Sequence, residues 1–325
     1  MIESVAHRTP LRVAVCRALA LTLSAVLAGL AGVSAQVTYQ KGQNVAPVYE
    51  GWERNPDGSF NLVFGYFNRN WVEEIDVPVG PNNTLDPGGP DSGQPTHFLP
   101  RRNRFLFRVR VPKDFGTREV VWTLTTQGKT ERAYGTLKPD YFIDDIVIQN
   151  NTGAGGAGGG QPDTLKNKPP TIQVEGDASR EATVGQPITL VALVADDGLP
   201  KPRAVRFTQG QPRSSRGTPS IATGLRLSWF VYRGTGKVVF DPAQITVWED
   251  YREGRNSPWS VDWEAPPPPA DGKWIVRATF SEPGTYVIRA LAHDGGLGAS
   301  RGPHCHREVN DRTAGPPTLE YSLAY

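Results

Sequence analysis

The sequence predicts an all-β protein made of two antiparallel β-sandwiches joined by a glycine-rich linker. In many short segments apolar and polar residues alternate with a period of two, as in strands that bury one face. Clusters of Gly, Pro, Asn and Asp separate these segments and are typical of turns. Apolar residues do not recur at helical spacing over the length of a helix, which argues against an α/β protein.

The N-terminal segment, residues 1–35, is predicted to be a secretory signal peptide. Its first part contains three arginines, Arg8, Arg12 and Arg17. An apolar stretch follows at 18–33, and the segment ends with the small residues Val33-Ser34-Ala35. A transmembrane anchor is the alternative, but the apolar stretch is shorter than the roughly 20 residues that span a bilayer. We therefore expect cleavage before Gln36, no membrane span afterwards, and export to the periplasm, the cell surface or the medium.

Removal of this segment leaves a chain of balanced charge. The whole sequence has 35 Lys and Arg against 33 Asp and Glu, and the leader carries three Arg and one Glu, so 32 of each remain. Because nucleic-acid binding requires a basic face, this balance argues against a nucleic-acid partner. The single remaining cysteine, Cys305, excludes an internal disulfide, and each domain must rely on a hydrophobic core.

The first sandwich is predicted over residues 36–149. In its clearest strand one face holds Phe105, Phe107, Val109 and Val111, and the other holds Arg104, Arg108 and Arg110. Further strands are expected at 60–66, 72–79, 120–124 and 141–148, and these five belong to a sandwich expected to have about seven strands.

A flexible Gly/Pro linker is predicted at 150–170, because its run of glycines has no side chains to pack. The second sandwich, 171–325, has alternating segments at 171–174, 188–194, 225–231, 237–240, 274–280 and 286–290. Trp229 lies inside one of them and is expected in the core. After residue 297 the alternation is lost, which predicts an irregular tail. A reading-frame change near residue 300 is an alternative explanation for that loss.

Several turn and strand motifs of the second half resemble those of polycystic-kidney-disease (PKD) and cadherin-like domains, which have an immunoglobulin-like fold. The resemblance covers about residues 169–297 and rests on Pro169-Pro-Thr-Ile172, Asp196-Asp-Gly198, Glu282-Pro-Gly-Thr-Tyr286 and Asp294-Gly295. It implies an immunoglobulin-like sandwich in this half and, as for many exported bacterial proteins, a spacer, adhesion or ligand-binding module. Together with the strand pattern of 36–149, two immunoglobulin-like sandwiches are expected. The segment Lys201–Thr223 departs from the pattern and is expected to be a mobile loop.

An aromatic insert is the main candidate binding site. Trp248, Tyr251, Trp259 and Trp263 lie close together in the sequence, among Glu249, Asp250, Asp262 and Glu264. Aromatic rings stack on the C–H faces of sugars, and carboxylates accept hydrogen bonds from sugar hydroxyls. Exposed aromatic side chains are also common binding hot spots. The alternative is that these rings cover one sheet as part of a core.

Two metal sites are worth considering. Asp196, Asp197 and Asp294 offer carboxylates for Ca²⁺ at one end of the second sandwich, although Asp-Gly sequences are also ordinary turn chemistry. His304-Cys305-His306 offers ligands for zinc or copper, but adjacent residues do not easily converge on one tetrahedral ion. No other cofactor is expected.

Catalysis has little support in the sequence. Nucleophile-elbow, zinc-protease and P-loop motifs are absent. The acidic pairs Glu73/Glu74 with Asp76, and Asp144/Asp145, are expected to be solvated, and so is the basic stripe of Arg101, Arg102, Arg104, Arg108 and Arg110. The sequence therefore predicts an exported, non-catalytic structural, adhesion or interaction protein of the cell envelope. Its partner is a glycan or an envelope protein, and a carbohydrate-binding accessory protein using the aromatic insert is the alternative.

Overall fold

A computed structural model describes residues 39–89, 91–144, 147, 166–205, 221–295 and 318–324. All of these belong to one compact unit, Tyr39–Tyr325. The predicted leader, most of the predicted linker, and the His304-Cys305-His306 string lie outside the described residues. Within the described ranges no helix is long and apolar enough to cross a membrane.

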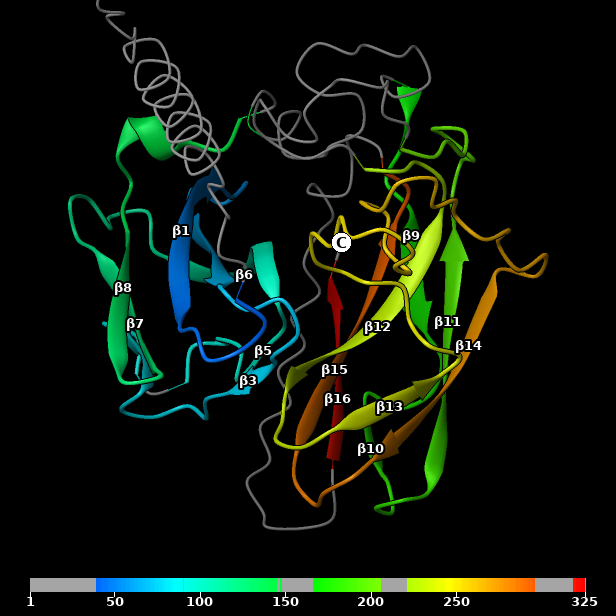
Figure 1. Ribbon diagram of the computed structural model, residues 1–325. Helices are drawn as coiled ribbons and strands as arrows, with labels where there is room; N and C mark the ends of the chain where they lie inside the picture. The colour runs from blue at the N-terminus through cyan, green and yellow to red at the C-terminus, as the bar shows by residue number, and fades with distance from the viewer. Residues whose placement is uncertain are drawn as a thin grey trace, which may run out of the picture. The chain divides into compact units, whose positions relative to one another are not determined.

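The first half contains three sheets (Figure 1). One has the order β1-β2-β6, another β4-β7-β8, and β3 pairs with β5. The strands are β1 (Val45–Arg54), β2 (Phe60–Asn68), β3 (Ile75–Asp76), β4 (Asn83–Asp86), β5 (His97–Phe98), β6 (Arg101–Val111), β7 (Val120–Thr126) and β8 (Lys129–Gly135). All their pairings are antiparallel. A short 3-10 helix, η1 (Pro139–Tyr141), follows.

The core of this half lies between the two three-stranded sheets. Alternate residues of β7, Val120, Trp122 and Leu124, are buried, as period-two alternation predicts. The Trp122 ring meets the Phe107 ring edge-on at 5.0 Å, and Phe107 stacks on Phe64 at 5.4 Å. Such aromatic pairs contribute beyond the area they bury.

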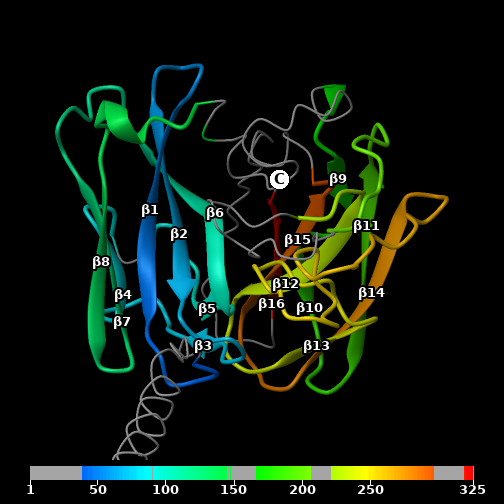
Figure 2. The same ribbon diagram turned by 45° about the horizontal axis from the view of Figure 1, so that its top comes forward.

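The second half contains two four-stranded sheets (Figures 1 and 2). One has the order β13-β14-β11-β9 and the other β10-β16-β15-β12. The strands are β9 (Thr171–Val174), β10 (Ser179–Glu181), β11 (Pro187–Ala195), β12 (Arg226–Arg233), β13 (Val238–Asp241), β14 (Lys273–Phe280), β15 (Tyr286–His293) and β16 (Thr318–Ala324). Leu190, Trp229, Val276 and Ile288 from the two sheets share one buried cluster, as expected for Trp229.

These observations confirm an all-β, sandwich-like protein with several antiparallel sheets. Two local expectations differ. The predicted strand at 141–148 is not formed in its described part, because Pro139 and Asp140 begin the 3-10 turn and only Phe142 bridges to Trp52. The predicted strand at 72–79 is reduced to the two residues of β3.

The C-terminal strand β16 was not expected, since an irregular tail was predicted there. Its pairing with β15 is parallel. Its pairing with β10 is antiparallel, like every other pairing between the described strands. The only ladder described for β10 is with β16, so this strand connects β10 to the rest of its sheet.

Candidate functional site

Residues of the first-half sheets pack directly against β12 and β15, and we call this contact the junction. Phe230, Tyr232 and Val287 belong to the same buried cluster as Phe98 and Leu99. The two halves therefore share a hydrophobic core rather than meeting only through the chain that links them.

Hydrogen bonds and ion pairs reinforce the junction. The Arg233 guanidinium forms two bonds of 3.0 and 2.8 Å with the Asp91 carboxylate and donates to the Gln94 carbonyl at 2.7 Å. The Thr96 amide donates to the Tyr232 carbonyl at 3.3 Å. Arg289 is buried, donates to the Leu106 carbonyl at 2.8 Å, and lies over the Tyr232 ring at 3.2 Å from its centroid. Burial lowers the pKa of Arg289. The neighbouring Tyr232 acts in the opposite direction and raises it.

The first two aromatic residues of the insert are part of the junction. Trp248 is half-buried against the first-half core, and the Tyr251 ring meets Trp71 edge-on at 5.1 Å. Between them, the Glu249 carboxylate pairs with Arg104 at 2.9 Å. Burial raises the pKa of Glu249, an effect that the nearby arginines oppose.

The other two aromatic residues, Trp259 and Trp263, are half-exposed and contact different neighbours. The Trp263 indole donates to Asn256 Oδ1 at 2.9 Å, and the buried Arg226 guanidinium lies 5.9 Å from its ring centroid. Asp262 is exposed and has a φ of 57°, which is uncommon for a residue other than glycine. Of the predicted sugar platform, these two rings lie outside the junction, and Tyr251 at the junction is also exposed.

The arginines of the β6 stripe have partners within the protein, although a solvated face was expected. Arg110, whose side chain is 64% exposed, is solvated as expected. Arg102 donates from Nη2 to both carboxylate oxygens of Glu50 at 2.7 Å. Arg108 forms a bidentate pair with Glu53 through Nε and Nη2, and Arg110 binds Asp57 and Ser59. Arg104 binds Glu249 at the junction, and Arg101 stacks on Trp71 at 4.1 Å. Bidentate pairing holds the guanidinium groups in fixed positions.

The three aspartates of the calcium prediction act mainly as turn acceptors. Asp196 accepts the Gly198 amide at 2.8 Å, Asp197 accepts the Leu199 amide at 2.9 Å, and the buried Asp294 accepts from Asn167 at 2.9 Å. Burial raises the pKa of Asp196, and the charges of Asp294 and Asp197 add to this effect. No group of three or more His, Cys, Asp or Glu side chains in the described ranges is arranged to hold a metal ion. Two oxygens here, Asp196 Oδ1 and Asn167 Oδ1, are buried without a hydrogen-bond partner.

An acidic–imidazole cluster connects β3 and β5. The His97 ring is only 5% exposed; its Nδ1 lies 2.7 Å from Asp76 Oδ1 and its Nε2 lies 3.2 Å from Glu74 Oε2. Burial lowers the pKa of His97, but the bonds to Asp76 and Glu74 outweigh burial and raise the pKa to about 9. His97 is therefore an imidazolium at neutral pH, which makes it unsuitable as a general base there.

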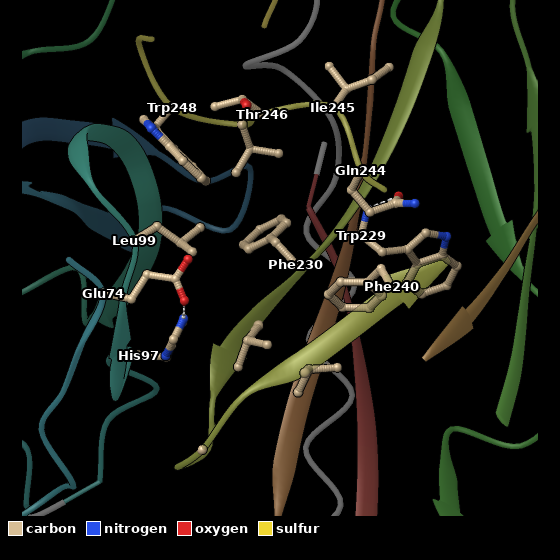
Figure 3. A pocket seen from close by; sticks show the side chains of 14 residues that line it. Glu74, His97, Leu99, Trp229, Phe230, Phe240, Gln244, Ile245, Thr246 and Trp248 are labelled. Carbon is tan, nitrogen blue, oxygen red and sulfur yellow. Dashed lines mark hydrogen bonds and ion pairs between the residues drawn. The ribbon is translucent and has the colours of Figure 1, made fainter. Parts of the chain in front are cut away.

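A pocket of about 160 Å³ opens beside this cluster. Its walls are mainly apolar and come from the end of β5, from β12 and β13, and from residues 244–248. Figure 3 shows the Glu74 carboxylate next to His97. This carboxylate lies on the side of His97 where the Phe230 ring lies. Glu74 and Asp76 were expected to be solvated as an acidic pair. Both are exposed, as expected, and both also contact the His97 imidazole, Asp76 from β3 and Glu74 from the position just before that strand begins.

The other predicted acids have simple local roles where they are described. Glu73 accepts the Gly42 amide at 2.6 Å, and Asp144 accepts the Val147 amide at 2.8 Å. Asp145 lies outside the described residues. The same is true of most of the Lys201–Thr223 loop, whose ends meet at an isolated bridge between Arg203 and Thr223.

Comparison of the chain with protein-family models, with curated proteins and with solved structures finds no match.

Proposed function

We propose that this chain is an exported, non-catalytic structural or interaction protein of the cell envelope whose two halves form one rigid body. The junction is the observation that supports this proposal. The aromatic and charged groups most suited to a surface site are used there to bind one half to the other, as in Glu249 with Arg104 and Tyr251 with Trp71. A shared apolar core with bidentate ion pairs resists hinge motion better than a flexible linker would.

Strand order supports an immunoglobulin-like fold for the second half, as the PKD and cadherin resemblance implies. In such domains the first, second, fifth and fourth strands form one sheet, and the third, sixth and seventh form the other. The order β9-β11-β14-β13 corresponds to the first sheet, and β12-β15-β16 to the second. The parallel direction of β16 is a departure, because the last strand of such a sheet runs antiparallel to its neighbour.

Distance measurement between two spin labels tests the rigid-body proposal. The labels are placed on Thr130→Cys in β8 and Thr189→Cys in β11, with Cys305→Ser to remove the remaining thiol of the exported form. Pulsed electron resonance is expected to give one narrow distance distribution. Loss of the two guanidinium groups in Arg104→Ala/Arg233→Ala is expected to broaden it. A broad distribution in the parent protein would show that the halves move independently and would refute the proposal.

Carbohydrate binding is the second candidate, and the half-exposed pair Trp259 and Trp263 supports it. Exposed carboxylates at Asp262 and Glu264 lie beside these rings in the sequence. Titration of residues 36–325 with soluble polysaccharides is expected to give a saturable change in tryptophan fluorescence that Trp259→Ala and Trp263→Ala abolish and Trp274→Phe retains. Ca²⁺ belongs in the same titration, because Asp196, one of the three aspartates of the calcium prediction with Asp197 and Asp294, has a buried oxygen without a hydrogen-bond partner. A flat response to every polysaccharide would refute the sugar-binding candidate.

A further inference from the structure

The pocket beside His97 combines apolar walls with one accessible carboxylate. Leu99, Phe230, Val231 and Trp248 contribute to the walls, and Glu74 is the acidic lining residue. The Glu74 side chain is 50% exposed and uses Oε2 for the ion pair with His97. Its other oxygen, Oε1, forms no hydrogen bond or ion pair with the described residues, and so it is available to a ligand.

The cluster beside the pocket carries an excess of one negative charge. Glu74 and His97 line the pocket with one negative and one positive charge, and Asp76, which pairs with His97 but is not a lining residue, adds the second negative charge. Lys and Arg do not occur among the residues that line the pocket. A cation at the mouth is therefore favoured over an anion, because like charges at a shared site repel each other.

The size of the pocket limits what can enter. An apolar cavity of roughly 150 Å³ accommodates one benzene molecule. At about 160 Å³ the pocket beside His97 encloses a single six-membered ring, and most of a sugar chain or a nucleotide would lie outside it. Apolar walls favour a ring without polar substituents, since a buried polar group without a partner is costly.

We propose that this pocket binds a small organic cation, namely an amine carried on one apolar or aromatic ring. The ring lies between Phe230 and Trp248, and the ammonium group lies at the mouth, where it pairs with Glu74 Oε1. Aromatic faces next to the cation add to the attraction. This site is separate from the half-exposed Trp259 and Trp263, and its occupation does not depend on the rigid-body proposal.

Binding of three probes of the same shape tests the proposal. Benzylamine, benzyl alcohol and benzoate carry positive, neutral and negative groups on the same ring, and each is titrated into residues 36–325 at pH 7 by isothermal calorimetry or protein-observed NMR. We expect benzylamine to bind about fivefold more tightly than benzyl alcohol, the preference expected from a half-exposed ion pair. Benzoate is expected to bind more weakly than either.

Two matched variants locate the charge effect. Glu74→Gln is expected to abolish the preference for benzylamine while leaving the affinity for benzyl alcohol unchanged, and that retained affinity shows that the variant is folded. Glu73→Gln, one residue away and outside the pocket lining, is expected to keep the full preference. Thr246→Trp, which fills the pocket from its wall, is expected to reduce binding of all three probes. Equal affinities for the amine and the alcohol in the parent protein, or equal effects of the Glu73 and Glu74 variants, would overturn the proposal.

Discussion

The imidazolium of His97 makes the stability of the folded state depend on pH in a way that can be calculated. The ring is buried between two carboxylates, and its pKa rises from the 6.5 of a free histidine to about 9 in the folded protein. A difference of about 2.5 units corresponds to about 3 kcal/mol of folding free energy. Because the folded state holds the proton more tightly, this contribution is complete below pH 6.5 and is lost as the pH rises through 9.

His97→Gln removes this titration. Urea unfolding at intervals between pH 6.5 and 9.5 is followed by tryptophan fluorescence for the parent and the variant. We expect the parent to lose about 3 kcal/mol over this interval and the variant to change much less. At pH 6.5 the variant is the less stable of the two, because Asp76 and Glu74 remain without their cation.

The result that would refute this reasoning is a parent protein with the same pH slope as His97→Gln. It would mean that the carboxylates do not hold the proton on the ring, and that burial alone determines its charge state. Neutral His97 would also leave two negative charges at the pocket, which would strengthen rather than remove the preference for an amine.

Three further outcomes are expected. Burial lowers the pKa of His293 well below 6.5, and the charge of Arg226 adds to this effect. The free energy of unfolding is therefore expected to fall as the pH drops below 6.5, and His293→Asn is expected to reduce that pH dependence in the same urea assay. Gly135→Ala places a methyl group 2.7 Å from the Phe64 ring and is expected to cost about 1–3 kcal/mol in urea unfolding, whereas an unchanged midpoint would show that the core can yield there. Deletion of 318–325 removes the partner of β10 and one neighbour of β15, so faster amide exchange in β15 is expected, and unchanged protection would show that β16 does not pair there.

The strands were the most predictable part of the fold because their signal is local. Alternation at 120–124 predicted most of β7 and its buried face, including Trp122, although the strand continues to Thr126. The same reasoning failed at 141–148, where apolar residues alternate but Pro139 fixes a turn just before them. It also overlooked β16, although Leu319, Tyr321 and Leu323 alternate with polar residues in the sequence.

The junction could not be predicted, because its contacts join residues far apart in the chain. Arg104 and Glu249 are separated by more than 140 positions, and nothing near either residue indicates the other. Exposed strand faces are usually charged, so the arginines of β6 alone predict a solvated face. Their carboxylate partners lie elsewhere in the sequence and become evident only in the structure. The pocket is different in part, since the two-residue spacing of Glu74 and Asp76 already places both carboxylates on one face. The sequence did not indicate that His97 lies opposite these two carboxylates.

The arginines of β6 and Glu74 at the pocket use their charges in different ways. Every arginine of the β6 stripe has a carboxylate or an aromatic face, and Arg233 is held by both oxygens of Asp91. Such complete pairing suits a body that must remain rigid, because each fixed ion pair limits relative motion. Glu74 pairs with His97 instead and keeps one oxygen unpaired next to a mainly apolar pocket. A carboxylate oxygen in that position is suited to recognition of a cation, and this is the reason to test the pocket with amines before any other surface.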